Sequence, residues 1–98
     1  MLTSKQRAYL RSLAVNEDTI LMVGKSGMGP EVIKQADDAL EKRELIKGRV
    51  LPETCPVSPR EAAEELAQKT GSDVVQVIGS RFVLYRRKKK DPKIVLPR

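Results

Sequence analysis

The residues most suited to chemistry lie in a short glycine-rich segment, Gly24-Lys25-Ser26-Gly27, between an apolar run and a helical pattern that begins at Pro30. Glycines allow a backbone to approach a ligand closely, and the first N–H groups of a helix have no partners within the helix. These groups and the charge of Lys25 predict a site for an anion. The alternative is that the glycines only permit a tight connection, and a Gly-x-x-Gly motif taken alone favours that alternative.

Basic residues in three other segments could contact the same anion. A helix predicted from residue 4 carries arginines on its outer face, a predicted strand over residues 44–51 places basic side chains on one face, and residues 86–90 form a basic block. Each pattern taken alone also fits an ordinary solvated surface. The candidate anion-binding residues are Gly24, Lys25, Ser26, Gly27, Arg7, Arg11, Lys47, Arg49, Arg86, Arg87 and Lys88.

The composition argues against catalysis and against a metal or cofactor site. The chain of 98 residues has no histidine and one cysteine, Cys55, which we interpret as an incidental free thiol in a proline-rich loop. Gly24-Lys25-Ser26 imitates the end of a nucleotide-binding P-loop, but Thr19 stands where that motif requires its first glycine. We therefore predict no catalytic residues, no metal and no cofactor. The lack of a long apolar run predicts no membrane contact and a cytoplasmic protein.

The elements that position these residues can be read from the hydrophobic pattern. Thr3 and Gln6 have the form of a capping box that begins the first helix, and the apolar run 19–23 reads as a buried strand. A helix over 30–43 leads to the strand 44–51, which implies a parallel pair, and a third helix over 58–71 ends at Gly71. Within the strand 44–51, Gly48 marks either a bulge or the close approach of another backbone.

A hairpin is predicted at the end of the domain, with strands over 73–79 and 81–87 joined at Gly79-Ser80. A regular two-residue turn would pair Val77 with Phe82 and Val75 with Leu84 on a core face, and would place Tyr85 on the other face. If that face is open, the ring of Tyr85 could stack on a base of a nucleic acid. The alternative is that Tyr85 is a half-buried strand tyrosine packed on the first helix. The sequence leaves both alternatives open.

The charges of the chain are unevenly distributed among these elements. The net charge is +6, and the helices 30–43 and 58–71 hold five basic and seven acidic residues, whereas the rest of the chain holds fourteen basic and six acidic ones. The basic elements are therefore the first helix, the glycine loop, the strand 44–51 and the segment after residue 85. This distribution predicts a one-sided phosphate-binding surface and gives weight to the glycine loop.

Six segments of the chain carry a resemblance to a known family: Leu2-Thr3-Ser4-Lys5-Gln6-Arg7, Val23-Gly24-Lys25-Ser26-Gly27, Glu44-Leu45-Ile46-Lys47, Val75-Gln76-Val77-Ile78-Gly79, Val83-Leu84-Tyr85-Arg86 and Leu96-Pro97-Arg98. Together with the order of the elements, they resemble the CRM domain (chloroplast RNA splicing and ribosome maturation), in particular its bacterial stand-alone YhbY family. The resemblance covers nearly the whole chain, as one domain over 1–98 with a basic segment from about residue 86. Met28-Gly29-Pro30 is a departure that could alter how the second helix begins.

The resemblance implies an α/β two-layer sandwich of order α-β-α-β-α-β-β with a four-stranded mixed sheet, similar to the C-terminal domain of translation initiation factor three. It implies a non-catalytic RNA-binding protein whose Gly-x-x-Gly loop meets the RNA backbone, with large-subunit ribosomal RNA as the expected partner during ribosome assembly. We expect a monomer. The alternative hypothesis is a protein-interaction module that docks on ribosomal proteins or assembly factors through the second face of the sheet and the apolar tail.

Overall fold

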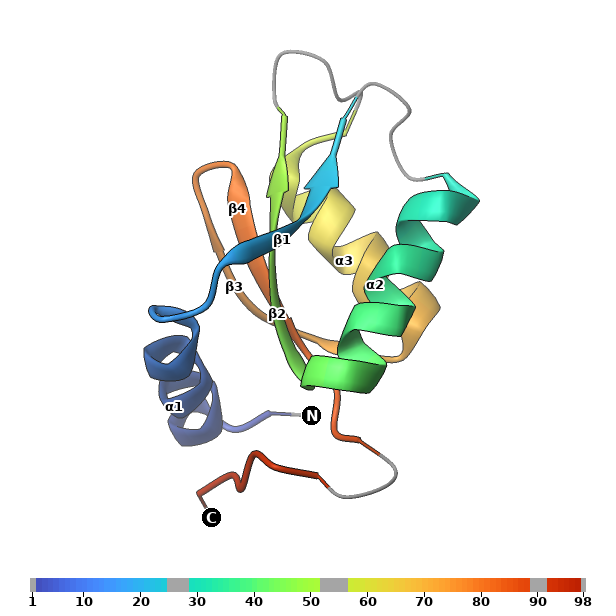
Figure 1. Cartoon of the computed structure of the whole chain (residues 1–98). Coiled ribbons are helices and arrows are strands. Elements are labelled where there is room, and N and C mark those ends of the chain that lie inside the picture. Colours follow the sequence, from blue (N-terminus) through green and yellow to red (C-terminus); the bar gives the residue numbers. More distant parts are fainter. Residues whose placement is uncertain (1, 25–28, 52–56, 89–91, 98) are drawn as a thin grey trace.

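A computed structural model describes residues 2–24, 29–51, 57–88 and 92–97, and it contains a four-stranded sheet with three helices (Figure 1). The strands lie in the order β1-β2-β4-β3, with β1 parallel to β2 and the other pairs antiparallel. The α/β class, the four-stranded mixed sheet and the element order are therefore as predicted, whereas α1 adds a partial third layer to the predicted two. The elements are α1 (Ser4–Ala14), β1 (Thr19–Val23), α2 (Pro30–Arg43), β2 (Leu45–Val50), α3 (Pro59–Thr70), β3 (Asp73–Ile78) and β4 (Arg81–Tyr85).

The helices begin and end where the capping residues predict. Thr3 and Gln6 form the reciprocal capping box of α1, and the Ser58 hydroxyl accepts the N–H of Glu61 at the start of α3. Gly71 ends α3 in the left-handed conformation with φ 68°. The strands β2, β3 and β4 end one or two residues inside the predicted ranges. Cys55 and the proline-rich loop lie outside the described residues.

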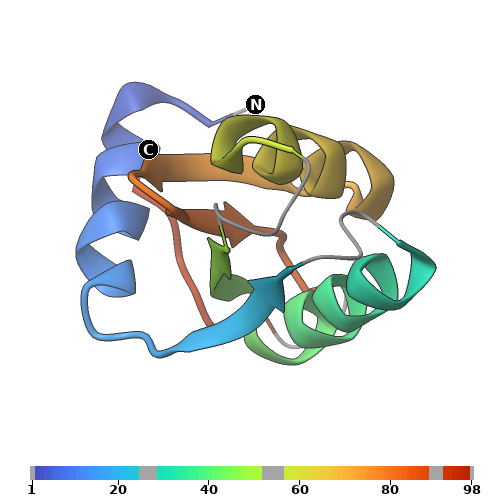
Figure 2. The same ribbon diagram turned by 90° about the horizontal axis from the view of Figure 1, so that it is seen from above.

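Two hydrophobic clusters lie on opposite faces of the sheet. Helices α2 and α3 cover one face and α1 lies on the other, as Figures 1 and 2 show. The larger cluster joins α2 and α3 to the sheet, and Phe82 and Leu84 are its buried residues on β4. The smaller cluster packs Leu10 and Ala14 of α1 against one half of the second face. Among the described residues, no helix lies over the other half of the second face, and this half is where the basic side chains of β2 lie (Figure 1).

Val75 faces the opposite side of the sheet from the one predicted. A bulge in β3 pairs Val74 with Leu84 and Gln76 with Val83, so that Val75 is an extra residue between them. An extra residue reverses the alternation of side chains along a strand. Val75 therefore turns toward α1, where it is 3% exposed. The predicted pairing of Val77 with Phe82 is confirmed.

Gly48 is required by an aromatic ring and not by a neighbouring backbone. Gly48 pairs with Phe82 on β4, and a Cβ atom built on Gly48 would lie 2.4 Å from Cζ of that ring. The ring thus occupies the space above the glycine in the larger cluster. The irregularity in the β1–β2 pairing lies on β1, between Thr19 and Leu21.

Glu44 connects the end of α2 to the C-terminal segment. It has φ 65° and is only 1% exposed, and one carboxylate oxygen accepts the N–H groups of Lys93 and Ile94. The side-chain amide of Gln6 donates to the carbonyl of Pro97. The segment 92–97 is therefore held beside α1, with Ile94 and Leu96 packed on the smaller cluster.

Candidate functional site

The uncovered half of the second sheet face carries a row of four paired residues, one from each strand. Met22 pairs with Arg49, Arg49 with Arg81, and Arg81 with Ile78. All four side chains are exposed, Met22 at 48% and Ile78 at 63%. We call Met22, Arg49, Arg81 and Ile78 the arginine row: two cations at the centre, with an apolar side chain at each end.

Lys47 adds a third cation beside the arginine row. It lies two residues before Arg49, on the same face of β2, and its neighbour on β4 is Val83. Lys47, Arg81 and Ile78 line a small pocket of about 190 Å³. Two of the three basic side chains, Lys47 and Arg81, thus line one hollow on the open half of the sheet.

The charge of this face is not neutralised within the described part of the chain. Arg49 and Arg81 occupy directly opposite positions on neighbouring strands, an arrangement that is unfavourable for like charges. Neither arginine, nor Lys47, forms an ion pair with a described residue. The local field therefore attracts an anionic ligand, and neutralising these charges would remove the repulsion between them.

Gly24 lies at the same end of the sheet as the arginine row. The N–H of Leu51 donates to the carbonyl of Val23, so the carboxyl ends of the parallel strands β1 and β2 lie side by side. A Cβ atom at Gly24 would make only ordinary contact with Leu51, at 3.4 Å. The other predicted residues of this loop, Lys25, Ser26 and Gly27, lie outside the described residues. Gly29 caps α2 without a side-chain hydrogen bond.

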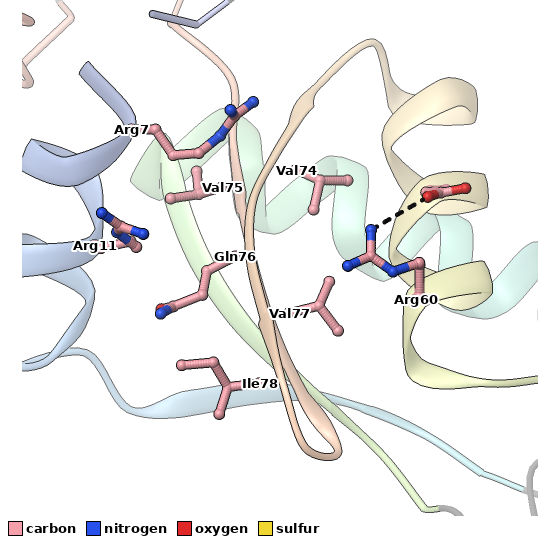
Figure 3. A pocket seen from close by; sticks show the side chains of 9 residues that line it. Arg7, Arg11, Arg60, Val74, Val75, Gln76, Val77 and Ile78 are labelled. Atoms are coloured by element: carbon pink, nitrogen blue, oxygen red, sulfur yellow. Dashed lines mark ion pairs between the residues drawn. The ribbon is translucent and has the colours of Figure 1, made fainter. Parts of the chain in front are cut away.

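Arg7 and Arg11 line a different surface, a groove that follows the edge strand β3 (Figure 3). The groove has a volume of about 540 Å³ and lies between α1 and α3. It adjoins the arginine row, because Gln76 and Ile78 line both this groove and the small pocket beside Lys47. The predicted basic residues therefore form two adjoining surfaces and not one continuous patch.

Arg86, predicted as an anion-binding residue, has its guanidinium engaged by contacts within the fold. One nitrogen donates to Oδ1 of Asp37 and to the carbonyl of Thr70, and the other donates to Oε2 of Glu41. The side chain is only 19% exposed. Arg86 thus connects the end of β4 to α2 and α3, and we assign it a structural role rather than a role in binding an anion. Its neighbours Arg87 and Lys88 have no ion pair with any described residue.

Replacing Arg86 with methionine is expected to lower the free energy of unfolding by about 1–2 kcal/mol, because the variant keeps the apolar stem but leaves the carbonyl of Thr70 without its donor. The exposed carboxylates contribute less, since solvent screens them. Arg87→Met is the matched control, expected to stay within about 0.5 kcal/mol. Urea unfolding monitored by circular dichroism measures both, and equal values would contradict the assignment of Arg86.

Tyr85 packs under α1, which decides between the two alternatives for this residue. Its side chain is 4% exposed and belongs to the smaller cluster with Leu10 and Leu45. Burial raises the pKa of the phenol, and the nearby carboxylate of Glu44 raises it further, so the side chain is neutral at physiological pH. Tyr85 is therefore a core residue and offers no stacking surface.

Arg81 is the candidate site residue that sequence reasoning missed. The predicted two-residue turn at Gly79-Ser80 places Arg81 at the start of a strand and opposite Ile78. The hairpin register was therefore a signal for the pairing of Arg81 with Ile78. The pairing of β2 with β4, which brings Arg81 beside Arg49, had no local signal. Glu44 was also missed, since the sequence reads it as the first residue of a strand.

The chain is a small α/β domain with a basic, partly open sheet face. The family model of the CRS1 / YhbY (CRM) domain matches residues 2–86, and the chain belongs to that family. The predicted resemblance is therefore confirmed. No helix in the described ranges has the length and apolar character needed to cross a membrane.

Similar proteins span the whole domain. The solution structure of SAV1595 from Staphylococcus aureus superposes with a TM-score of 0.80 at 50% identity, covering 99% of this chain and 100% of that one. The "Probable RNA-binding protein YqeI" of Bacillus subtilis is 44% identical over 97 residues, covering 99% of this chain and 100% of its own. The "RNA-binding protein" of Haemophilus influenzae is 33% identical over 101 residues, covering 99% of this chain and 96% of its own.

Proposed function

We propose that this protein is a non-catalytic RNA-binding protein and that the arginine row, Lys47 and the glycine loop form its RNA interface. The observation that carries the proposal is the juxtaposition of Arg49 and Arg81 on an open sheet face, without a carboxylate partner in the described residues. Phosphates neutralise such a pair, and the release of counterions from RNA adds a favourable free energy. Relatives that bear the name of RNA-binding proteins support the same class of ligand.

The glycine loop completes the interface at the carboxyl ends of β1 and β2. Gly24 directly follows β1 at the end of the sheet that carries the arginine row, and Gly29 is the N-cap of α2, which begins at Pro30. In the proposal, the backbone of Gly24-Lys25-Ser26-Gly27 approaches the RNA backbone and Lys25 pairs with a phosphate, as loops of this type do in other RNA-binding folds. Arg7 and Arg11 lie at the border of the interface, across Gln76 and Ile78, and Arg87 and Lys88 lie beyond the end of β4.

The expected ligand is large-subunit ribosomal RNA in an assembling particle, bound by a cytoplasmic monomer. This finer proposal rests on the family to which the chain belongs. A docking role on ribosomal proteins through the apolar tail has less support, because Ile94 and Leu96 pack within the chain.

Lys25→Glu is expected to weaken binding to a structured fragment of large-subunit ribosomal RNA by about tenfold, because it replaces an attraction to phosphate with a repulsion. Filter binding across a series of salt concentrations measures the affinity and its salt dependence. The wild-type affinity should fall steeply as salt rises, whereas Lys34→Glu on the exposed side of α2 should leave it nearly unchanged. A flat salt response, or equal effects of the two variants, would count against the proposal.

A further inference from the structure

The groove along β3 meets the arginine row at Ile78 and lies outside Lys47 and the glycine loop, and Arg7 and Arg11 stand between the two surfaces. Its floor is the edge strand of the sheet, since β3 pairs with β4 and with no other described strand. Arg7 and Arg11 of α1 form one wall, and Arg60 of α3 forms the other (Figure 3). We propose that this groove binds an extended acidic segment of a partner protein, which adds to β3 as a further strand.

The hydrogen bonds between β4 and β2 show which backbone N–H and C=O groups of β3 point away from the sheet. The carbonyl of Ser80 accepts from Val50, and the N–H of Arg86 donates to Glu44, so the even-numbered residues of β4 turn toward β2. The odd-numbered residues of β4 therefore bond to β3. Val77 pairs with Phe82, an even-numbered residue, and its N–H and C=O thus point outward into the groove. Val74, paired with Leu84, points outward for the same reason.

The outward N–H and C=O groups match the backbone of an extended polypeptide, which supplies an acceptor and a donor together. The N–H of Val77 needs an acceptor and its C=O needs a donor, and no described residue bonds to either group from outside the sheet. Phosphate oxygens only accept hydrogen bonds, whereas an extended peptide supplies both kinds of group at the spacing of a strand. The valine side chains on the floor give the added strand apolar contacts.

The walls of the groove set the charge and the size of the ligand. Arg7 and Arg11 have no ion pair with a described residue, and Arg60 has one exposed pair, with Glu64 at 3.7 Å. The three cations favour glutamate or aspartate on the incoming strand. The bulge at Val75 limits the regular edge of β3 to a short stretch, so the complex should be weak and rapidly exchanging.

The test uses the full chain and a short blocked peptide that alternates glutamate with valine. Nuclear Overhauser contacts between the peptide backbone and Val77, and protection of the Val77 amide from exchange, are the expected results. A peptide with lysine in place of glutamate and one with N-methylated backbone amides should bind at least about tenfold more weakly. Binding without contacts to β3, or binding that survives N-methylation, would overturn the proposal.

Two variants separate this ligand from RNA. Arg60→Glu should weaken peptide binding by about tenfold and leave RNA affinity unchanged, because Arg60 lies on α3, away from the arginine row, and Lys34→Glu should change neither. Val77→Pro removes the outward N–H without touching the ladder to β4 and should abolish peptide binding. If Val77→Pro fails to fold, the effects of Arg60→Glu and of the N-methylated peptide still test whether the peptide binds as an added strand. If RNA displaces the peptide, and Arg60→Glu weakens the binding of both RNA and peptide, the groove is an RNA site and the proposal is overturned.

Discussion

Reversing both central charges of the arginine row, with Arg49→Glu and Arg81→Glu, is expected to reduce the affinity for structured ribosomal RNA by about 100-fold or more. The two side chains are exposed and face each other across β2 and β4, so they act on the same stretch of ligand. Each single change to alanine should lower the slope of log affinity against log salt by about 0.7–0.9, the value for one phosphate contact. Filter binding or fluorescence anisotropy over a salt series gives both quantities.

The control for this pair carries the same change in charge at another place. Lys42→Glu and Lys69→Glu lie on exposed positions in the last turns of α2 and α3, on the far side of the sheet from the arginine row. Together they should change RNA affinity by less than about threefold. If the control weakens binding as much as the reversal of Arg49 and Arg81, net charge and not this face determines the affinity. Circular dichroism should show both double variants folded.

Replacing Gly48 with valine is expected to lower the free energy of unfolding by at least about 3 kcal/mol. Three ring atoms of Phe82 lie 2.4–2.9 Å from the position of the new Cβ, and that ring is 1% exposed within the larger cluster. Marginal stability makes this loss large for a domain of this size. Even Gly48→Ala should destabilise, although alanine in place of a strand glycine normally stabilises by about 0.5–1 kcal/mol. Urea unfolding of the variants measures the effect.

A second substitution tests the cause of that loss. Phe82→Leu removes the ring atoms that meet the new Cβ, so Gly48→Ala combined with Phe82→Leu should be more stable than the sum of the single changes predicts, by about 1 kcal/mol. Additive effects would show that the ring is not what excludes a side chain at position 48. An unchanged stability in Gly48→Ala would contradict the packing described for β2.

Local signals in the sequence predict the elements of this fold well. Capping residues such as Thr3 and Ser58, and Gly71 after α3, satisfy helix ends through contacts within a few residues, which a sequence shows directly. The hairpin turn at Gly79 is equally local. The bulge at Val75 could not be predicted, because it depends on which faces of the sheet α1 and α3 cover.

The candidate site also contains residues that local sequence signals predict and residues that only long-range contacts bring together. Lys47 and Arg49 follow from strand alternation, whereas Arg81 joins them only through the pairing of β2 with β4, which lie thirty residues apart in the chain. Arg86 reads as part of a basic block, yet its partners Asp37 and Glu41 come from a distant helix. Glu44 holds Lys93 and Ile94 for the same kind of reason. Contacts between remote segments decide which charges are free to bind.

The most direct test of the RNA interface is an amide chemical-shift titration of the isotopically labelled protein with a structured fragment of large-subunit ribosomal RNA. The amides of Met22, Lys47, Arg49 and Arg81, and those of the glycine loop, should shift together as RNA is added. The amides of α2 beyond its first turn and of α3 should remain in place. Shifts confined to α2 and α3, with the arginine row unchanged, would contradict the proposed interface.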